Sequence, residues 1–260
     1  TTWTSLPLAV SGPSATFVWY SVDVIGSRIV LSGDYGVIAV SNDAGATWNS
    51  NNNNLKSSLN FDITTVPGTS KYWTIGRPFG TATGKQMMYS SNSGASWTTY
   101  NLGVTGDFFS ISMINEFTGY VSGQNNQVLK TTDGGMSWTA KTGPSPVSTS
   151  QHYTCEFIDE NTGFTFVNFS TVAGGNVFKT TNGGDNWMQY STGATSENIY
   201  HADMVDANTG YCVMNPSNRP VYKTTNGGGN WTPLTTGLTG SIRSVSAVDA
   251  NTVYVCQTGG

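Results

Sequence analysis

Charged residues are scarce in this sequence, and basic ones especially so. Only 10% of the 260 residues are charged, and 11 Lys and Arg against 15 Asp and Glu leave a net charge of −4. A general nucleic-acid partner is excluded, because phosphate binding needs a basic face. No apolar run approaches the roughly 18 residues of a membrane span, so no membrane insertion is expected.

Cysteine is nearly absent. Cys155, Cys212 and Cys256 form no CxxC pair and no metal-ligand spacing, so we expect neither a metal nor another cofactor. We interpret the three as small buried residues, with a Cys212–Cys256 disulfide as the alternative. The chain begins "TTWTSLP", without a signal-peptide pattern, which we interpret as a mature product or a fragment of a longer chain.

Aromatic residues and small polar residues are plentiful instead. Aromatics make up 12% of the chain, which is too many for a disordered protein. Abundant Gly, Ser, Thr and Asn with many β-formers suggest an extracellular or cell-surface location.

One turn recurs five times. "KTTDGGMSW", "KTTNGGDNW" and "KTTNGGGNW" are close copies that begin at Lys130, Lys179 and Lys223, and "SNDAGATW" and "SSNSGASW" are degenerate ones that begin at Ser41 and Ser90. All five fit Ser/Thr, any, Asp/Asn, any, Gly, any, any, Trp. Their tryptophans recur every 41–49 residues, a period typical of propeller blades.

The repeated turn has a structural interpretation. Asp or Asn at the third position can accept hydrogen bonds from backbone N–H groups two residues on, Gly at the fifth supplies a left-handed conformation, and Trp packs on the hairpin. We therefore expect a structural role, not a ligand site, for Asp43, Gly45, Trp48, Asn92, Gly94, Trp97, Asp133, Gly135, Trp138, Asn182, Gly184, Trp187, Asn226, Gly228 and Trp231.

A second repeat sets the phase of the strands. "INEFTGYVSG", "IDENTGFTFV", "VDANTGYCVM" and "VDANTVYVCQ" each predict strand, tight turn, strand. A blade then has four strands, A to D, with the repeated turn between C and D. The five turns resemble Asp-boxes, also called BNR repeats, and the chain resembles sialidase-like and photosystem II assembly-factor-like propellers and repeat domains of secreted Bacteroidetes-type surface proteins.

The sequence thus predicts one all-β domain over residues 1–260, a β-propeller of four-stranded antiparallel blades. Six blades are expected, or seven if the chain is a fragment. The last would be closed by the N-terminal strand, because "TTWTSLP" resembles "NWTPL" after the fifth turn. The blades are placed near 14–50, 58–100, 107–141, 151–190, 198–234, and 241–260 plus 1–6.

The resemblance implies a ligand face at the end of the blades away from the Asp-boxes. Aligned inner strands place an aromatic residue at one equivalent position of four blades and Arg243 in the sixth, with Tyr20 as the nearest match in the first. Stacking on a ligand and packing of blade on blade are the two interpretations. The candidate ligand-binding residues are Tyr20, Phe61, Arg77, Phe109, Tyr153, Tyr200, Arg219 and Arg243.

No catalytic residue is assigned. A sialidase needs three arginines and paired acids, so this alternative requires Arg77, Arg219 and Arg243 to converge in one pocket beside Glu197. Asp34, Asp107 and Glu197 could form a carboxylate pair only from different blades. His152 and His201 share no spacing, so we interpret them as ordinary polar strand residues.

The expected function is a non-catalytic binding or scaffold propeller in adhesion, glycan contact or protein assembly. Its partner would be a protein or glycan on a surface, and the chain would belong to a larger chain or assembly. A sialidase-like glycoside hydrolase is the alternative.

Overall fold

The computed structural model describes residues 18–51, 57–78, 86–146, 148–168, 176–191, 199–214, 221–235, 237–238 and 241–258. All of the regular structure in these ranges is β-strand. No helix among them is long and apolar enough to cross a membrane.

Five four-stranded antiparallel sheets follow one another along the chain. The first comprises β1 (Trp19–Ile25), β2 (Arg28–Gly33), β3 (Ile38–Ser41) and β4 (Asn49–Asn51). The second comprises β5 (Ser57–Thr65), β6 (Tyr72–Pro78), β7 (Gln86–Ser90) and β8 (Thr98–Asn101). The third comprises β9 (Phe108–Met113), β10 (Gly119–Gly123), β11 (Val128–Thr131) and β12 (Thr139–Ala140).

The fourth sheet comprises β13 (Gln151–Phe157), β14 (Gly163–Asn168), β15 (Val177–Thr180) and β16 (Met188–Tyr190). The fifth comprises β17 (Ile199–Met204), β18 (Gly210–Met214), β19 (Val221–Thr224) and β20 (Thr232–Leu234). A further sheet has two described strands, β21 (Ser241–Ala247) and β22 (Val253–Thr258).

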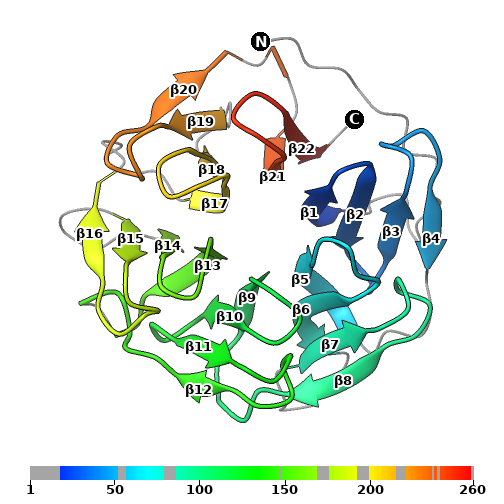
Figure 1. Ribbon diagram of the computed structural model, residues 1–260, viewed down its shortest axis with the longest axis horizontal. Coiled ribbons are helices and arrows are strands. Elements are labelled where there is room, and N and C mark those ends of the chain that lie inside the picture. The colour runs from blue at the N-terminus through cyan, green and yellow to red at the C-terminus, as the bar shows by residue number, and fades with distance from the viewer. Residues whose placement is uncertain are drawn as a thin grey trace.

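The sheets stand around a common centre as the blades of a propeller (Figure 1). The first strand of each sheet is innermost, and β21 packs against both β17 and β1, which brings the two ends of the chain into one ring. The prediction of four-stranded antiparallel blades is confirmed for five sheets. Closure by the N-terminal strand concerns residues 1–6, which lie outside the described ranges.

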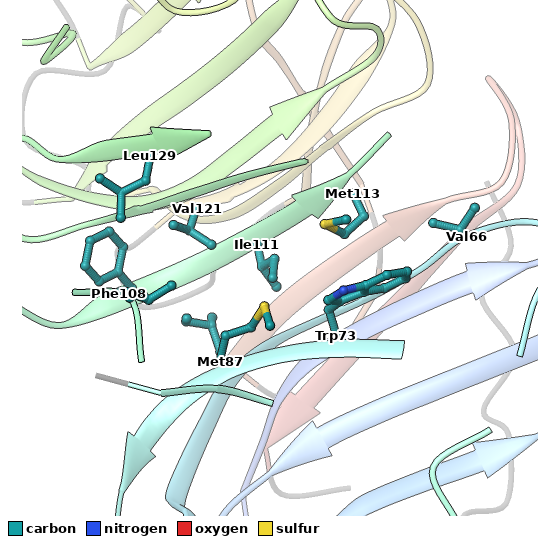
Figure 2. Close-up of a cluster of buried hydrophobic side chains, with 10 residues drawn as sticks. Val66, Trp73, Met87, Phe108, Ile111, Met113, Val121 and Leu129 are labelled. Carbon is teal, nitrogen blue, oxygen red and sulfur yellow. The ribbon is translucent and has the colours of Figure 1, made fainter. Parts of the chain in front are cut away.

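The hydrophobic core lies between blades. In the largest cluster, Trp73 and Met87 of the second blade pack against Phe108, Ile111 and Val121 of the third (Figure 2). Trp73 is fully buried, and its indole Nε1 donates to the Gly134 carbonyl oxygen of the third blade at 2.9 Å. Each blade therefore stabilises the next by burying apolar area from both sheets.

The Asp-box forms the hairpin between the third and fourth strands of all five complete blades, as predicted. In the third blade, Asp133 Oδ1 accepts from the Ser137 backbone N–H at 2.9 Å, and Thr131 Oγ1 accepts from the Gly135 N–H at 2.9 Å. The predicted role of the acid as a hydrogen-bond acceptor is confirmed, but the predicted position of the donor N–H, two residues on, was wrong. The donor lies four residues on, because the loop curls back over the carboxylate.

Glycine at the fifth box position has a positive φ in all five turns, between 83° and 92°, as the sequence predicted. The fourth position is also left-handed, which the sequence pattern did not show. Ala44 and Ser93 hold φ near 57° and 56° there. The N–H of this residue donates to the turn between the first two strands of the same blade, as from Gly134 to the Phe117 carbonyl at 2.8 Å.

The tryptophan that ends the box closes the hairpin through its indole N–H in four of the five boxes. Trp48, Trp97, Trp138 and Trp231 each donate to the carbonyl oxygen of the box glycine at 3.0–3.2 Å. Trp187 donates instead to the Thr142 carbonyl oxygen of the preceding blade, at 3.0 Å. The box side chains are thus committed to hydrogen bonds within the fold.

All three cysteines are free thiols, so the alternative of a Cys212–Cys256 disulfide is wrong. Cys155 and Cys212 are fully buried, and Cys256 is partly buried against the first blade. Burial raises the pKa of the Cys256 thiol to about 12, which leaves it unreactive at neutral pH.

Candidate functional site

Six residues at one equivalent position of the inner strands form the candidate site. Each is the unpaired residue of a β-bulge in the pairing between the first and second strands. In a strand, successive side chains point to opposite faces of the sheet. A bulge breaks this alternation at its extra residue and changes the direction of that side chain. We call this set the collar: Tyr20, Phe61, Phe109, Tyr153, Tyr200 and Arg243.

Neighbouring collar side chains touch one another around the ring. The centroids of Tyr20 and Phe61 are 6.0 Å apart, and those of Phe61 and Phe109 are 5.4 Å apart, both edge to face. Phe109 and Tyr153 stack at 4.4 Å with 20° between their planes. The sequence alignment of these positions therefore corresponds to a physical row of rings.

The collar also carries charge. The Arg243 guanidinium lies over the Tyr200 ring, 5.5 Å from its centroid. Burial, followed by a hydrogen bond from its hydroxyl to Asp34, raises the pKa of Tyr20 to about 12. Asp34 Oδ2 in turn accepts from the Val18 backbone N–H at 3.0 Å. Phe109 is only 8% exposed, whereas Tyr20, Tyr153 and Tyr200 are partly exposed and could offer ring faces to a ligand.

The collar and the Asp-boxes lie at opposite ends of the blades. Collar residues stand at the start of each inner strand, and the boxes dock on the turns that follow the end of those strands. Box residues therefore cannot take part in a site at the collar.

Two other predicted ligand residues cannot be placed. Arg219 lies outside the described ranges, and for Arg77 only the backbone in β6 is described. Glu197, which the hydrolase alternative needs beside the arginines, is also outside them. Of the three predicted arginines, Arg243 is placed, on the collar.

The described acidic residues outside the collar lie in separate surroundings. Asp34 is on the collar side of the first blade, and Asp107 is nearly buried before β9. Glu116 lies in the turn at the box end and pairs with Lys71 Nζ at 2.7 Å. Glu156 lies in the middle of β13, where burial, followed by the charges of Asp203, Asp62 and Asp23, raises the pKa of its carboxyl.

The two histidines differ in role. His152 is fully buried: its Nε2 lies 2.9 Å from Asn126 Oδ1, and its Nδ1 contacts the Thr165 hydroxyl. An amide oxygen only accepts, so Nε2 carries the proton and Nδ1 accepts from threonine. Burial lowers the pKa of His152 to about 3, which keeps it neutral. His201 instead lies at the centre of the ring, with Nε2 3.7 Å from Asp62 Oδ1.

Sequence reasoning missed a set of polar links inside the ring. Side chains one and three residues beyond the collar reach the backbone of the next inner strand. Asp62 Oδ2 accepts from the Ile111 N–H at 2.9 Å, and Asp203 Oδ2 accepts from the Ala247 N–H at 2.6 Å. Polar residues at alternate positions of an inner strand were the available signal, because alternate residues share one face.

These residues form two central polar layers. The upper layer, one residue beyond the collar, comprises Ser21, Asp62, Ser110, Thr154, His201 and Ser244. The lower layer, three residues beyond the collar, comprises Asp23, Thr64, Ser112, Glu156, Asp203 and Ser246. No three of the described His, Cys, Asp and Glu side chains are arranged to hold a metal ion.

Solved structures share the fold. YCF48 from Cyanidioschyzon merolae matches with a TM-score of 0.64 and 13% identity, over 100% of this chain and 97% of that one. A structure described as YCF48 bound to D1 peptide matches with a TM-score of 0.64 and 12% identity, over 96% and 78%. An ancestral GH74 enzyme matches with a TM-score of 0.64 and 20% identity, over 100% of this chain but 37% of its own.

No curated protein sequence matches the chain. A family model described as "Photosynthesis system II assembly factor YCF48" matches residues 88–259. The expected extracellular or cell-surface location is therefore wrong, because assembly of a photosystem is not a cell-surface process. The match spans more than half of the 260 residues and agrees with the predicted BNR-type propeller, so the chain belongs to the photosynthesis system II assembly factor YCF48 family.

Proposed function

We propose that this propeller is a non-catalytic module that holds a segment of a partner protein against the collar while a larger complex assembles. The observation that carries the proposal is the collar itself: six bulged residues at one end of the ring, five of them aromatic. Ring faces and a guanidinium are groups that dominate binding at protein interfaces.

Two further observations support a peptide as the ligand. The family is one of assembly factors, and a structure with the same fold is described as bound to a D1 peptide. The tyrosines at this end offer ring faces together with hydroxyl groups, which suits contact with a peptide that has both apolar and polar atoms.

A glycan is the second candidate ligand. Aromatic rings also stack on sugars, and the fold is shared with GH74 enzymes, one of them a xyloglucanase from Xanthomonas campestris at 13% identity. Hydrolysis would need a pair of acids about 5–10 Å apart across the collar face. Asp34 and Asp107 come from different blades, and no described contact joins them. We therefore propose binding and not catalysis.

The test is selection of binders by the full chain. A random peptide display library and a glycan array are offered in parallel, and the hits are measured by calorimetry. Peptide binders whose affinity falls in a Tyr200→Ala variant, but not in a Phe117→Ala variant, would support the proposal. Phe117 is the matched control because it is aromatic, 60% exposed and at the box end. Glycan hits without peptide hits, or equal effects of the two variants, would contradict it.

We also propose that the ring is completed as six blades, with Thr1–Pro7 supplying an outer strand to the β21–β22 sheet. The support is the likeness between "TTWTSLP" and "NWTPL", together with the position of β21 between β17 and β1. Sharing one blade between both ends protects the edges of a propeller.

A further inference from the structure

Hydrogen bonds from the central polar layers link most neighbouring inner strands. Thr65 N donates to Asp23 Oδ2 at 2.7 Å, and Phe157 N donates to Ser112 Oγ at 3.0 Å. With the Asp62–Ile111 and Asp203–Ala247 bonds, the same kind of link recurs from blade to blade. Each link satisfies a backbone donor on the inner edge of the ring.

The boundary between β13 and β17 departs from this pattern. Thr154 and Glu156 occupy the two linking positions of β13, but neither accepts a hydrogen bond from a described residue of β17. The Thr154 hydroxyl is buried, and no described residue forms a hydrogen bond with it. His201, the next residue around the upper layer, is 7% exposed, and neither ring nitrogen has a hydrogen-bond partner within the described ranges. Buried polar groups in native proteins are rarely left unpaired, so these atoms point to an additional molecule.

Among the described residues around this boundary, carboxylates outnumber basic side chains, and His201 Nε2 lies 3.7 Å from Asp62 Oδ1. Four carboxylates face the centre, those of Asp23, Asp62, Glu156 and Asp203. The described ion pairs of lysine lie elsewhere, at Lys71–Glu116 and Lys141–Asp185. Burial first, and then the charges of Asp203, Asp62 and Asp23, raise the pKa of the Glu156 carboxyl well above its usual value. A cation at the centre would relieve this repulsion.

The acceptor set selects the kind of cation. A carboxylate, a hydroxyl oxygen and a neutral imidazole nitrogen can each accept one hydrogen bond, and a primary ammonium donates three and accepts none. Since no three of the described His, Cys, Asp and Glu side chains are arranged to hold a metal ion, the spacing does not suit direct metal coordination. The collar residues just before Thr154 and His201 are Tyr153 and Tyr200, whose ring faces attract cations. Arg243 over Tyr200 shows one such contact.

We propose that a primary ammonium group of the bound peptide enters beside Tyr153 and Tyr200 and is held by Glu156, Thr154 and His201. The proposal rests on the proposed function and names the chemistry of its ligand. A lysine side chain and a free peptide N-terminus both supply the group.

The first experiment uses n-butylammonium, which has the four-carbon amine of a lysine side chain. The full chain is titrated with n-butylammonium at constant ionic strength, and the His201 ring resonances are followed by NMR. Titrations with NaCl and with n-butanol are the controls. We expect saturable shifts of these resonances with n-butylammonium and not with the two controls. Glu156→Gln should lower the affinity for n-butylammonium about tenfold or more. Glu160→Gln is the matched control, an exposed carboxylate in the turn after β13.

Affinity for n-butylammonium should also rise with pH, because Glu156 must release its proton to bind. Asp23, Asp62, Asp203 and His201 face the same space, so the rise is assigned to Glu156 only if it flattens in the Glu156→Gln variant. A response equal to that of NaCl, no saturable shift, or full binding by Glu156→Gln would overturn the proposal.

A second experiment, with modified peptides, tests the ammonium site separately from the proposed peptide binding. Peptides selected by the full chain are remade with norleucine for lysine or with an acetylated N-terminus, which distinguishes the two sources of the amine. Loss of affinity in one of these arms is expected. Peptides that bind tightly without any amine, together with silence of n-butylammonium, would leave peptide binding standing and refute the ammonium site.

Discussion

Phe109 of the third blade stacks on Tyr153 of the fourth, with ring centroids 4.4 Å apart and planes 20° apart. The pair joins two inner strands at the collar, so part of the collar stabilises the ring whatever it binds. Aromatic pairs contribute about 0.5–1.5 kcal/mol beyond the area they bury. A double-mutant cycle of Phe109→Ala and Tyr153→Ala, measured by urea unfolding, should give a coupling free energy in that range. A coupling near zero would mean that the two rings only share space.

The box glycine predicts a local cost of substitution. Gly135 has φ 92°, and an added Cβ would meet Met87 Cε and Sδ at 2.6 Å. Gly135→Val should lower the free energy of unfolding by more than about 1 kcal/mol, because a β-branched residue resists this backbone conformation. Gly103→Val is the control: its φ of 74° imposes a similar backbone strain, but no described atom lies within 4 Å of the added Cβ, so it should lose less stability than Gly135→Val. Equal melting temperatures for wild type and Gly135→Val would refute the structural role of this position.

The central acids predict how stability depends on pH. Burial raises the pKa of Asp23 from 3.8 to about 7, although Thr65 donates to its carboxylate. Because the folded protein binds this proton with a pKa of about 7 and the unfolded chain with 3.8, the stability that the proton contributes is fully present below pH 3.8 and is lost as the pH rises to about 7. The melting temperature should therefore fall between about pH 4 and pH 7, and the fall should shrink in Asp23→Asn. An unchanged slope in that variant would contradict the assignment.

Ring closure is tested by truncation. Deleting Thr1–Pro7 should lower the melting temperature if these residues add a strand to the β21–β22 sheet. Replacing Trp3 by Ala should reproduce part of the loss, because a tryptophan follows each of the five boxes and Trp3 would take its place in the last blade. A truncated protein that melts like the full chain would show that the ends share no blade.

The features that could be predicted from sequence are those that repeat with the blade. The left-handed glycines and the alignment of Phe109, Tyr153 and Tyr200 recur every 40 to 50 residues, so several weak signals reinforced one another. The left-handed fourth box position was missed because Ala44 and Ser93 occupy it in the first two blades, and neither residue signals that conformation.

The central polar layers could not be predicted for a different reason. Asp62 and Ile111 are 49 residues apart, and their hydrogen bond exists only because the inner strands of neighbouring blades pack side by side. The same holds for the Thr154 hydroxyl and the His201 ring, which form no hydrogen bond with a described residue and whose environment is set by packing of separate blades. The predicted extracellular location was wrong because it was inferred from composition alone. Composition reflects solubility and strand content, and these do not depend on where a propeller works.

The most direct test of peptide binding at the collar pairs two variants of the full chain. Tyr200→Ala removes a collar ring, and Asp133→Ala removes the carboxylate that accepts from the Ser137 backbone N–H at 2.9 Å and from the Thr131 hydroxyl at 2.8 Å. Affinity for a selected peptide is measured by calorimetry and stability by urea unfolding. Tyr200→Ala should weaken binding several-fold with little loss of stability, and Asp133→Ala should lose about 1–2 kcal/mol of stability at unchanged affinity. Loss of binding in a folded Asp133→Ala protein, with Tyr200→Ala silent, would place the ligand at the opposite end of the ring and contradict the proposal.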